Sequence, residues 1–343
     1  MSSVAGEFEL IAAIRERIAR AGGPETSTAL VLGSGDDAAI TVREGATATS
    51  VDALVEGVHF TIPPFSPRQV GHKALAVALS DLAAMGAGAG EAYVQLGVPA
   101  DRSEAELLEI ADGLAELAAL HGVAIAGGDL SRAPSLLLAV TVVGGGADVD
   151  ALVRRSGARA GDLVAVTGEL GGAAAGLLLV ERPQLRPQLD PGVAAALLAR
   201  QTEPSPRLAA GAALAATGAT AMIDISDGLG ADAAHLASAS GVGLEIELES
   251  LPVQTGVAAV AEAAGVDPLD LAASGGEDYE LLATLAPERI EAAGDAVAAT
   301  GSSLSVIGRV SAGPGVTLSG PGGPRAPDGF DQLRYRRAPG DPA

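Results

Sequence analysis

Along the first half of the chain, hydrophobic residues recur with two alternating spacings, one typical of helices and one typical of strands. Apolar positions three and four residues apart predict an amphipathic helix over residues 7–21. A stretch that is apolar on every side, KALAVALSDLAAMGA, predicts a buried helix over roughly 67–86. The other elements expected in this half are a helix at 103–121 and strands at 28–32, 37–42, 47–54, 91–98, 122–126 and 135–143. Three glycines, 144–146, are expected to end the last strand.

The second half of the chain restarts the same alternation. Its expected strands lie at 162–168, 221–226, 243–248 and 304–310, with one more in the second part of SGGEDYELLATL. Its expected helices lie at 171–180, 193–200, 206–216, 228–240 and 287–299, and a proline-rich excursion occupies 183–191. Mixed strands and helices predict an α/β (α+β) protein of two domains. We place these domains at 1–147 and 148–335, and expect a disordered tail over 336–343.

The amino-acid composition limits which binding partners and which cellular compartment we expect for the protein. The 343 residues carry a formal net charge of −22, which argues against nucleic acid or an anionic membrane as a partner. The absence of cysteine excludes disulfides, thiol catalysis and thiolate metal sites. The N-terminus lacks the regions of a signal peptide, and no apolar run reaches the ~20 residues of a membrane helix. We therefore expect a cytoplasmic protein.

Acidic residues stand in apolar surroundings along the whole chain. The stretch from Gly33 to Phe60 places Asp36, Asp37 and Asp52 among alanine, valine and leucine. Ionised carboxylates in such surroundings cost on the order of several kcal/mol unless a partner compensates them, and the chain has a single lysine. A hard divalent cation is the simplest remaining partner. The same pattern recurs at Asp81, Asp129, Asp224, Asp227, Glu277 and Asp278, and we expect the fold to bring these acids to one place.

The common nucleotide-binding motifs are absent from the sequence. No GxxxxGK[ST] loop or protein-kinase signature occurs, and the GxGxG at 86–90 follows a helix instead of a strand. Four glycine-rich loops are nevertheless expected after strands, at 127–129, 168–172, 226–228 and 274–278. The second and third open into helices, whose free N–H groups suit phosphate oxygens. Each loop, taken alone, is also consistent with an ordinary turn or helix cap. The presence of an acidic residue in all four loops favours a binding site.

Three polar residues have settings that suggest function. Asp81 lies in the apolar helix, and an internal ion pair with Lys73, two turns earlier, is the structural alternative to metal binding. His59 follows the acidic strand and is a candidate substrate contact. Arg155 lies at the expected domain junction, where it fits a phosphate clamp and a solvated surface arginine almost equally well.

Nine motifs, taken in order along the chain, carry a resemblance to a known family. They are GDDAA, VDALVEGVHF, KALAVALSDLAAMGA, IAGGD, RRSGARAGD, TGELG, EPSPR, IDISDGL and SGGEDYEL. Together they resemble the thiamine-monophosphate kinases, within the wider group of aminoimidazole-ribotide-synthetase-like ATP enzymes. The resemblance covers nearly the whole chain, from about Gly6 to Phe330.

This resemblance implies a PurM-like architecture of two domains. The N-terminal domain is then a mixed α/β domain whose sheet pairs across a homodimer, and the C-terminal domain is an α/β sandwich. ATP, as co-substrate, and several Mg²⁺ ions are expected in a cleft lined by the acids.

The resemblance also implies roles for individual residues. The expected catalytic residues are Asp37, Asp52, Asp81 and Asp129. The expected Mg²⁺ ligands are Asp37, Ser50, Val51, Asp52, Asp81, Asp129, Asp224 and Asp227. ATP contacts are expected from Gly128, Asp129, Arg155 and Ser226, and substrate contacts from His59, Glu277 and Phe330. Val51 departs from the family's frequent threonine, so only its backbone carbonyl can serve as a ligand.

The implied reaction is phosphorylation of thiamine monophosphate by ATP, giving ADP and thiamine diphosphate by Mg²⁺-assisted, direct in-line transfer. The acceptor is a phosphate that is already ionised, so no general base is needed. Two alternatives stay open at this point. One is another ATP-dependent ligase or synthetase of the same superfamily, and the other is a non-catalytic regulator that binds metal and thiamine phosphate.

Overall fold

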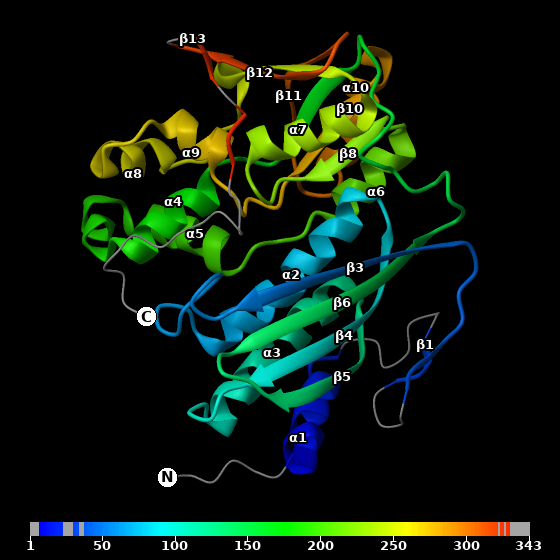
Figure 1. Cartoon of the computed structure of the whole chain (residues 1–343), viewed down its shortest axis with the longest axis vertical. Coiled ribbons are helices and arrows are strands. Elements are labelled where there is room, and N and C mark those ends of the chain that lie inside the picture. The colour runs from blue at the N-terminus through cyan, green and yellow to red at the C-terminus, as the bar shows by residue number, and fades with distance from the viewer. Residues whose placement is uncertain (1–6, 23–29, 34–37, 322, 326, 330–343) are drawn as a thin grey trace. The chain divides into compact units, whose positions relative to one another are not determined.

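The computed structural model describes residues 7–22, 30–33, 38–321, 323–325 and 327–329. These residues belong to two compact units, one of residues 1–82 and 87–149 and the other of residues 83–86 and 150–343 (Figure 1). Asp37, Phe330 and the expected tail 336–343 lie outside the described residues. In the ranges that are described, no helix is long and apolar enough to cross a membrane.

The N-terminal unit contains three helices and six strands in its described part. The helices are α1 (Glu7–Arg20), α2 (Pro67–Ala84) and α3 (Glu104–His121). The strands are β1 (Leu30–Leu32), β2 (Ile40–Thr41), β3 (Ala46–Val55), β4 (Gly88–Val98), β5 (Ala124–Arg132) and β6 (Leu137–Gly146). The first two strands pair with each other, and the other four form one sheet.

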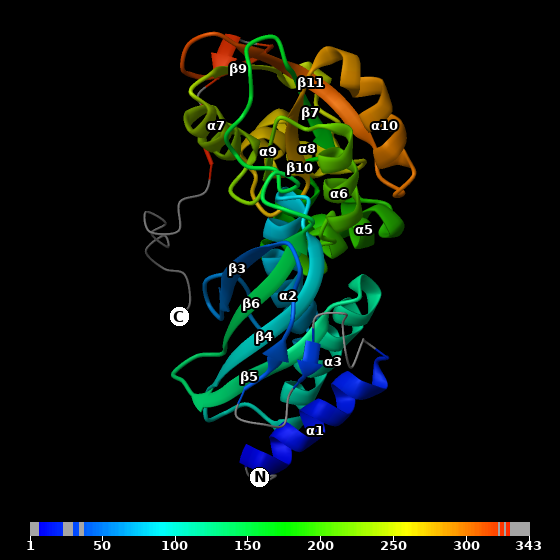
Figure 2. The same cartoon turned by 90° about the vertical axis from the view of Figure 1, so that its right-hand side faces the viewer.

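The four-stranded sheet has the order β3-β6-β4-β5. Its first two junctions are antiparallel and the β4–β5 junction is parallel. Helices α2 and α3 lie against one face of this sheet, while the other face is turned to the viewer (Figure 1). Helix α1 runs beside α3, as the second view shows (Figure 2). The sheet is therefore covered by α2 and α3 on one face, and its open face carries exposed side chains such as Val51, which is 64% exposed.

Helix α2 confirms the expectation of a buried helix. Every residue from 73 to 80 is buried, and the helix contacts both β3, through Asp81, and α3, at Gly71. Close packing requires a glycine at the crossing with α3, since a Cβ on Gly71 would meet the carbonyl oxygen of Ile110 at 2.0 Å. The single lysine, Lys73, is itself fully buried, and its ammonium nitrogen lies 5.4 Å from the ring centroid of Phe65.

Two glycine-rich stretches of this unit lie inside strands, contrary to expectation. The sequence predicts a loop at 127–129, but β5 continues through it to Arg132. A Cβ on Gly128 would meet the carbonyl oxygen of Val94 on β4 at 2.1 Å, so the close approach of the two strands requires glycine. The glycines at 144–146 were expected to end a strand, but they form the last part of β6 and pair with residues 46–48 of β3.

The C-terminal unit contains a larger share of the elements. Its α-helices are α4 (Gly172–Glu181), α5 (Pro191–Thr202), α6 (Leu208–Thr217), α7 (Leu229–Ser240), α8 (Val257–Ala264), α9 (Pro268–Ser274) and α10 (Ile290–Ala298). Its strands are β7 (Leu163–Thr167), β8 (Ala221–Asp224), β9 (Gly243–Glu247), β10 (Leu281–Leu285), β11 (Leu304–Ser311), β12 (Gly315–Gly320) and β13 (Gly323–Arg325). The proline-rich excursion forms a short 3₁₀ helix, η1 (Pro183–Gln188), before Asp190 caps α5.

The second sheet has the order β13-β12-β9-β11-β7-β10-β8. Helix α7 packs on one face, where its apolar side meets a core of valine, leucine and isoleucine from six strands. Helices α6 and α10 lie on the opposite side of the sheet in both views (Figures 1 and 2). The expected α/β sandwich is confirmed in this unit. Strands β12 and β13 are absent from the expectation, because their segment is rich in glycine and proline, which have low strand propensity.

Candidate functional site

The N-terminal unit places three of the expected metal ligands near one face of β3. Side chains alternate between the faces of a strand, so Ser50 and Asp52 share a face with the buried Ala48 and Leu54. This face is turned toward α2, because the Ser50 hydroxyl donates a hydrogen bond to the carboxylate of Asp81. The structure therefore brings Asp81 to Ser50, and it puts Asp52 one strand repeat further along the same face.

Val51 and His59, two further expected residues of this unit, are placed differently from the acids. The side chain of Val51 lies on the open face of the sheet, away from Asp81. Only its backbone carbonyl could supply an oxygen ligand. The ring of His59 accepts a hydrogen bond at Nδ1 from the backbone N–H of Val55, at 3.0 Å. In a neutral imidazole this contact puts the proton on Nε2 and fixes the ring beside the end of β3.

Asp129 is remote from Asp52 within one chain. It lies on β5, opposite Gln95 of β4, whose amide nitrogen donates to the Asp129 carboxylate at 2.9 Å. The register continues through Ala139 of β6 to Ala53 of β3, so Asp129 shares its face with Ala53 and not with Asp52. The strands β3 and β5 are the two edges of the sheet, about 14 Å apart at the usual strand spacing. For this pair the expectation of one acidic cluster is wrong within a single chain.

An apolar cavity of about 110 Å³ borders two of the expected ATP contacts. Gly128 and Asp129 form part of its wall, and side chains from α1, α3 and β4 form the rest, among them Ile11, Ile14 and Val94. The cavity lies on the helix-covered side of the sheet, where Gly128 faces α1 and α3. The expected nucleotide contacts of this unit thus adjoin apolar space.

The C-terminal unit gathers a second group of acids at the end of β8. Asp224 is the last residue of this strand and is only 3% exposed. The carboxylate of Asp232, one turn into α7, accepts hydrogen bonds from the backbone N–H groups of Ser226 and Asp227, both at 3.0 Å. Burial, with Asp224 nearby, raises the pKa of Asp232 to about 7. Asp232 was missed by the sequence reasoning, although an acid in the apolar run GADAAHLA was a usable signal.

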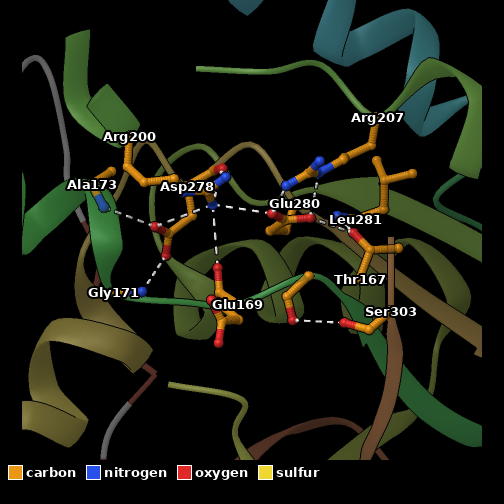
Figure 3. A network of polar contacts seen from close by, with 11 residues as sticks. Thr167, Glu169, Gly171, Ala173, Arg200, Arg207, Asp278, Glu280, Leu281 and Ser303 are labelled. Atoms are coloured by element: carbon orange, nitrogen blue, oxygen red, sulfur yellow. Dashed lines mark hydrogen bonds and ion pairs between the residues drawn. The ribbon is translucent and has the colours of Figure 1, made fainter. Parts of the chain in front are cut away.

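The start of α4 is occupied by a carboxylate of the protein itself. Asp278, 1% exposed, accepts hydrogen bonds from the N–H groups of Gly171 at 2.7 Å and Ala173 at 3.1 Å (Figure 3). The loop at 168–172 was expected to offer these groups to phosphate, and that expectation is wrong because Asp278 fills the position. Burial raises the pKa of this carboxyl to about 6, while Arg200 and the two N–H donors favour the ionised form.

A buried network of charges lies beside Asp278. Glu280, fully buried, accepts two hydrogen bonds from Arg207, at 2.8 and 2.5 Å, and one from the hydroxyl of Thr167 at 2.7 Å (Figure 3). Arg200 approaches the same carboxylate at 3.1 Å and also donates to the backbone carbonyl of Asp278 at 2.9 Å. Two motifs, EPSPR and SGGEDYEL, therefore meet in this network, which holds the segment between Glu277 and Glu280.

Glu277 is held in an uncommon backbone conformation. Its φ of 68° and that of Tyr279, 50°, lie in the left-handed region, which costs a non-glycine residue roughly 1–2 kcal/mol. The backbone compensates, because Glu277 N–H donates to the carbonyl of Ser226 and Tyr279 N–H to that of Ile225, both at 2.8 Å. The carboxylate of Glu277 accepts a hydrogen bond from the amide of Gln201 at 2.6 Å. The structure thus brings Glu277 to Ser226, two residues expected in the site.

Arg155 is the remaining expected ATP contact in the described part of the chain. Arg155 has an exposed side chain, and its backbone carbonyl accepts a hydrogen bond from Ser240 at 3.0 Å. The guanidinium group of this arginine therefore belongs to a solvent-exposed residue. Asp37 and Phe330 belong to the residues that the structure does not describe.

The oxygen atoms of the described residues fit Mg²⁺ only if one chain supplies few of the ion's ligands. No group of three or more histidine, aspartate or glutamate side chains is close enough to hold a metal among the described residues. Mg²⁺ is usually bound by one or two carboxylates, with water and substrate phosphates completing its shell. The Ser50–Asp81 contact and the acids at the end of β8 match that donor set.

Family comparisons cover most of the chain. Residues 35–145 match the family described as AIR synthase related protein, N-terminal domain, and residues 159–320 match the corresponding C-terminal domain. A thiamine-monophosphate kinase of Mycobacterium tuberculosis is 40% identical over 284 residues, which is 81% of this chain and 80% of the relative. The enzyme of that name from Escherichia coli K12 is 38% identical over 90% of this chain and 91% of its own.

Solved structures show the same similarity. The thiamine-monophosphate kinase of Stenotrophomonas maltophilia K279a superimposes with a TM-score of 0.78 and 36% identity, over 91% of this chain and 96% of its own. A structure of AaThiL complexed with AMPPCP and TMP has a TM-score of 0.73 and 32% identity, over 93% and 96%. With identities above 30% along nearly the full length, this chain belongs to the thiamine-monophosphate kinase family.

Proposed function

We propose that this protein is a kinase that transfers the terminal phosphoryl group of ATP to thiamine monophosphate, releasing ADP and thiamine diphosphate. One observation carries the proposal: a relative whose structure was solved with AMPPCP and TMP aligns over 93% of this chain at 32% identity. The chain also carries, in order, the acidic and glycine-rich motifs on which the reaction would depend. The alternatives of a ligase or of a non-catalytic regulator have no comparable support.

Different residues of the chain are assigned to Mg²⁺, to ATP and to thiamine monophosphate. We assign Mg²⁺ binding to Ser50, Asp52, Asp81, Asp129, Asp224 and Asp227, with Asp37 and the backbone carbonyl of Val51 as further ligands. ATP contacts fall to Gly128, Asp129, Arg155 and Ser226, and thiamine phosphate contacts to His59, Glu277 and Phe330. When bound, Mg²⁺ would offset the repulsion between two anionic substrates and a chain of net charge −22. No residue needs to act as a base, because the acceptor phosphate is already ionised at neutral pH.

We further propose that the protein acts as a homodimer through the open face of the N-terminal sheet. This face carries the exposed side chain of Val51, and folded proteins usually cover the edge strands of a sheet, which are β3 and β5 here. Asp129 lies on the same face, so a second copy placed there would adjoin it. The proposal also includes a cytoplasmic location, where ATP is produced.

A coupled assay tests the function. Purified protein with ATP, Mg²⁺ and thiamine monophosphate should release ADP only when all three are present, in step with thiamine diphosphate. Release of ADP that requires an amine or amide co-substrate would support a ligase instead. Binding of thiamine monophosphate without ADP release would support the regulator.

A further inference from the structure

A buried glutamine that the proposed function does not use lies against Glu277. Gln201, in the last turn of α5, is 2% exposed, and its amide nitrogen donates to the Glu277 carboxylate at 2.6 Å. A carboxylate only accepts hydrogen bonds, so the nitrogen of this amide must be the atom that faces Glu277. The other amide atom, Oε1, is buried and has no hydrogen-bond partner within the described part of the chain. Native proteins rarely leave a buried acceptor unsatisfied, because doing so costs free energy.

Both members of this pair are held firmly. On the α5 side, Gln201 packs against Gly176 of α4, where an added Cβ would come within 2.9 Å of the Gln201 Cβ. On the other side, the backbone of Glu277 is fixed by its hydrogen bond to Ser226 at 2.8 Å. Next to Gln201, Arg200 donates to the carbonyl of Asp278 and so ties the following residue to the same helix. The amide oxygen and the Glu277 carboxylate are thus two neighbouring acceptors on a fixed frame.

Two neighbouring acceptors match a primary amino group, which offers two N–H donors. We propose that Gln201 is a further substrate-recognising residue, which holds the Glu277 carboxylate with its amide nitrogen and accepts an N–H of the substrate's aminopyrimidine with its amide oxygen. Glu277 accepts the second N–H of the same amino group. The inference rests on the proposed function, since it takes thiamine monophosphate as the substrate and Glu277 as its contact.

The test compares two substrates that differ only in this amino group. Wild type and Gln201→Met are assayed with thiamine monophosphate and with the analogue whose pyrimidine amino group is replaced by hydrogen. We expect Gln201→Met to lower kcat/KM for thiamine monophosphate about 10- to 100-fold, because the site loses a hydrogen bond to the amino group. The same change should leave kcat/KM for the analogue and KM for ATP within about twofold.

A control on the same helix separates recognition from packing. Thr202→Val removes the hydroxyl of a residue that is only 5% exposed. This hydroxyl donates a hydrogen bond to the Leu198 carbonyl of the same helix, at 3.0 Å. This variant should keep the preference of the wild type for thiamine monophosphate. Gln201→Leu serves if the methionine variant does not fold, because it also removes both the amide oxygen and the N–H donor. It should raise KM for thiamine monophosphate and leave KM for ATP unchanged.

The possible results distinguish failure of this inference from failure of the proposed function. Equal losses for thiamine monophosphate and the analogue, or no loss for either, would show that Gln201 only packs α5 against the segment of Glu277, and would overturn the inference while the proposed function stands. A wild-type protein that neither turns over nor binds thiamine monophosphate would overturn both. Loss confined to the amino-bearing substrate supports the inference.

Discussion

At the scale of single residues, the C-terminal unit buries charges that need exact partners to be tolerated. Glu280 is fully buried, yet Arg207 and Arg200 both approach its carboxylate. The sequence predicted that acids stand in apolar surroundings, but it assigned the compensation to metal. For Glu280 and Asp278 the compensation comes from arginines and helix N–H groups that lie 70 or more residues away along the chain. No local pattern encodes such pairings, so they were not predictable from one sequence.

The Arg207–Glu280 pair yields a prediction for stability. Arg207→Met should reduce the free energy of unfolding by about 3–5 kcal/mol, because it removes a bidentate partner from a buried carboxylate. Urea unfolding followed by circular dichroism measures the change. The control is Arg309→Met, which breaks an exposed ion pair with Glu245 and should cost no more than about 1 kcal/mol. Equal losses in the two variants would mean that the buried pair contributes nothing beyond a surface contact.

Asp81 yields a prediction for activity. Asp81→Asn keeps an acceptor for the Ser50 hydroxyl, so we expect a folded protein that has lost most of its activity. Excess Mg²⁺ or Mn²⁺ should restore part of the activity, because the lost charge weakens metal binding without removing the site. Asp101→Asn, at an exposed position, is the matched control and should be fully active. A variant that loses stability but keeps its specific activity would favour the internal ion pair with Lys73.

At the scale of elements, strong hydrophobic periods were predictable and glycine-rich strands were not. Helix α2 and the strands β3, β7 and β10 lie where their apolar patterns predict them. In β5 and at the end of β6 the pattern failed, because glycine has low strand propensity and its place in a strand depends on a neighbour that approaches too closely for a side chain. For the same reason residues 127–129, which were expected to form a loop, lie in the sheet instead. Asp129 therefore lies on β5, away from Asp52.

Neighbouring glycines in β5 provide a matched pair of variants. Gly128→Ala should destabilise the N-terminal unit by about 1–3 kcal/mol, because the added Cβ would lie 2.1 Å from the Val94 carbonyl oxygen and force the strands apart. Gly127→Ala should be tolerated, since its Cβ would meet the Tyr93 ring at an ordinary 3.4 Å. Thermal unfolding of both variants provides the measurement. A Gly128→Ala protein as stable as the Gly127→Ala protein would contradict the register of β5 against β4.

At the scale of the whole molecule, each unit gathers its own acids, and no described group in either unit forms a complete metal site. This division explains why the sequence could suggest residue types for a metal site but not how the fold groups them. A single sequence reveals which acids are unusual, whereas the sheet order that separates β3 from β5 arises from pairings between distant segments.

The open face of the N-terminal sheet predicts a dimer. Sedimentation equilibrium at micromolar concentration should give twice the 33.5 kDa chain mass. Val51→Lys puts a charge on the open face and should shift the protein toward monomer, because a buried interface does not tolerate unpaired charge. Val149→Lys, at an exposed position outside the sheet, is the control and should leave the dimer intact. A fully active monomer at all concentrations would contradict the proposed interface.

The fate of the terminal phosphoryl group of ATP tests the central claim most directly. Protein, Mg²⁺, thiamine monophosphate and ATP labelled in the terminal phosphate are incubated together, and the products are separated. Our account predicts that the label appears in thiamine diphosphate at the same rate as ADP forms, with no labelled protein at any time. Label released as inorganic phosphate, retained on the protein, or left in ATP while thiamine monophosphate stays unchanged would contradict the account.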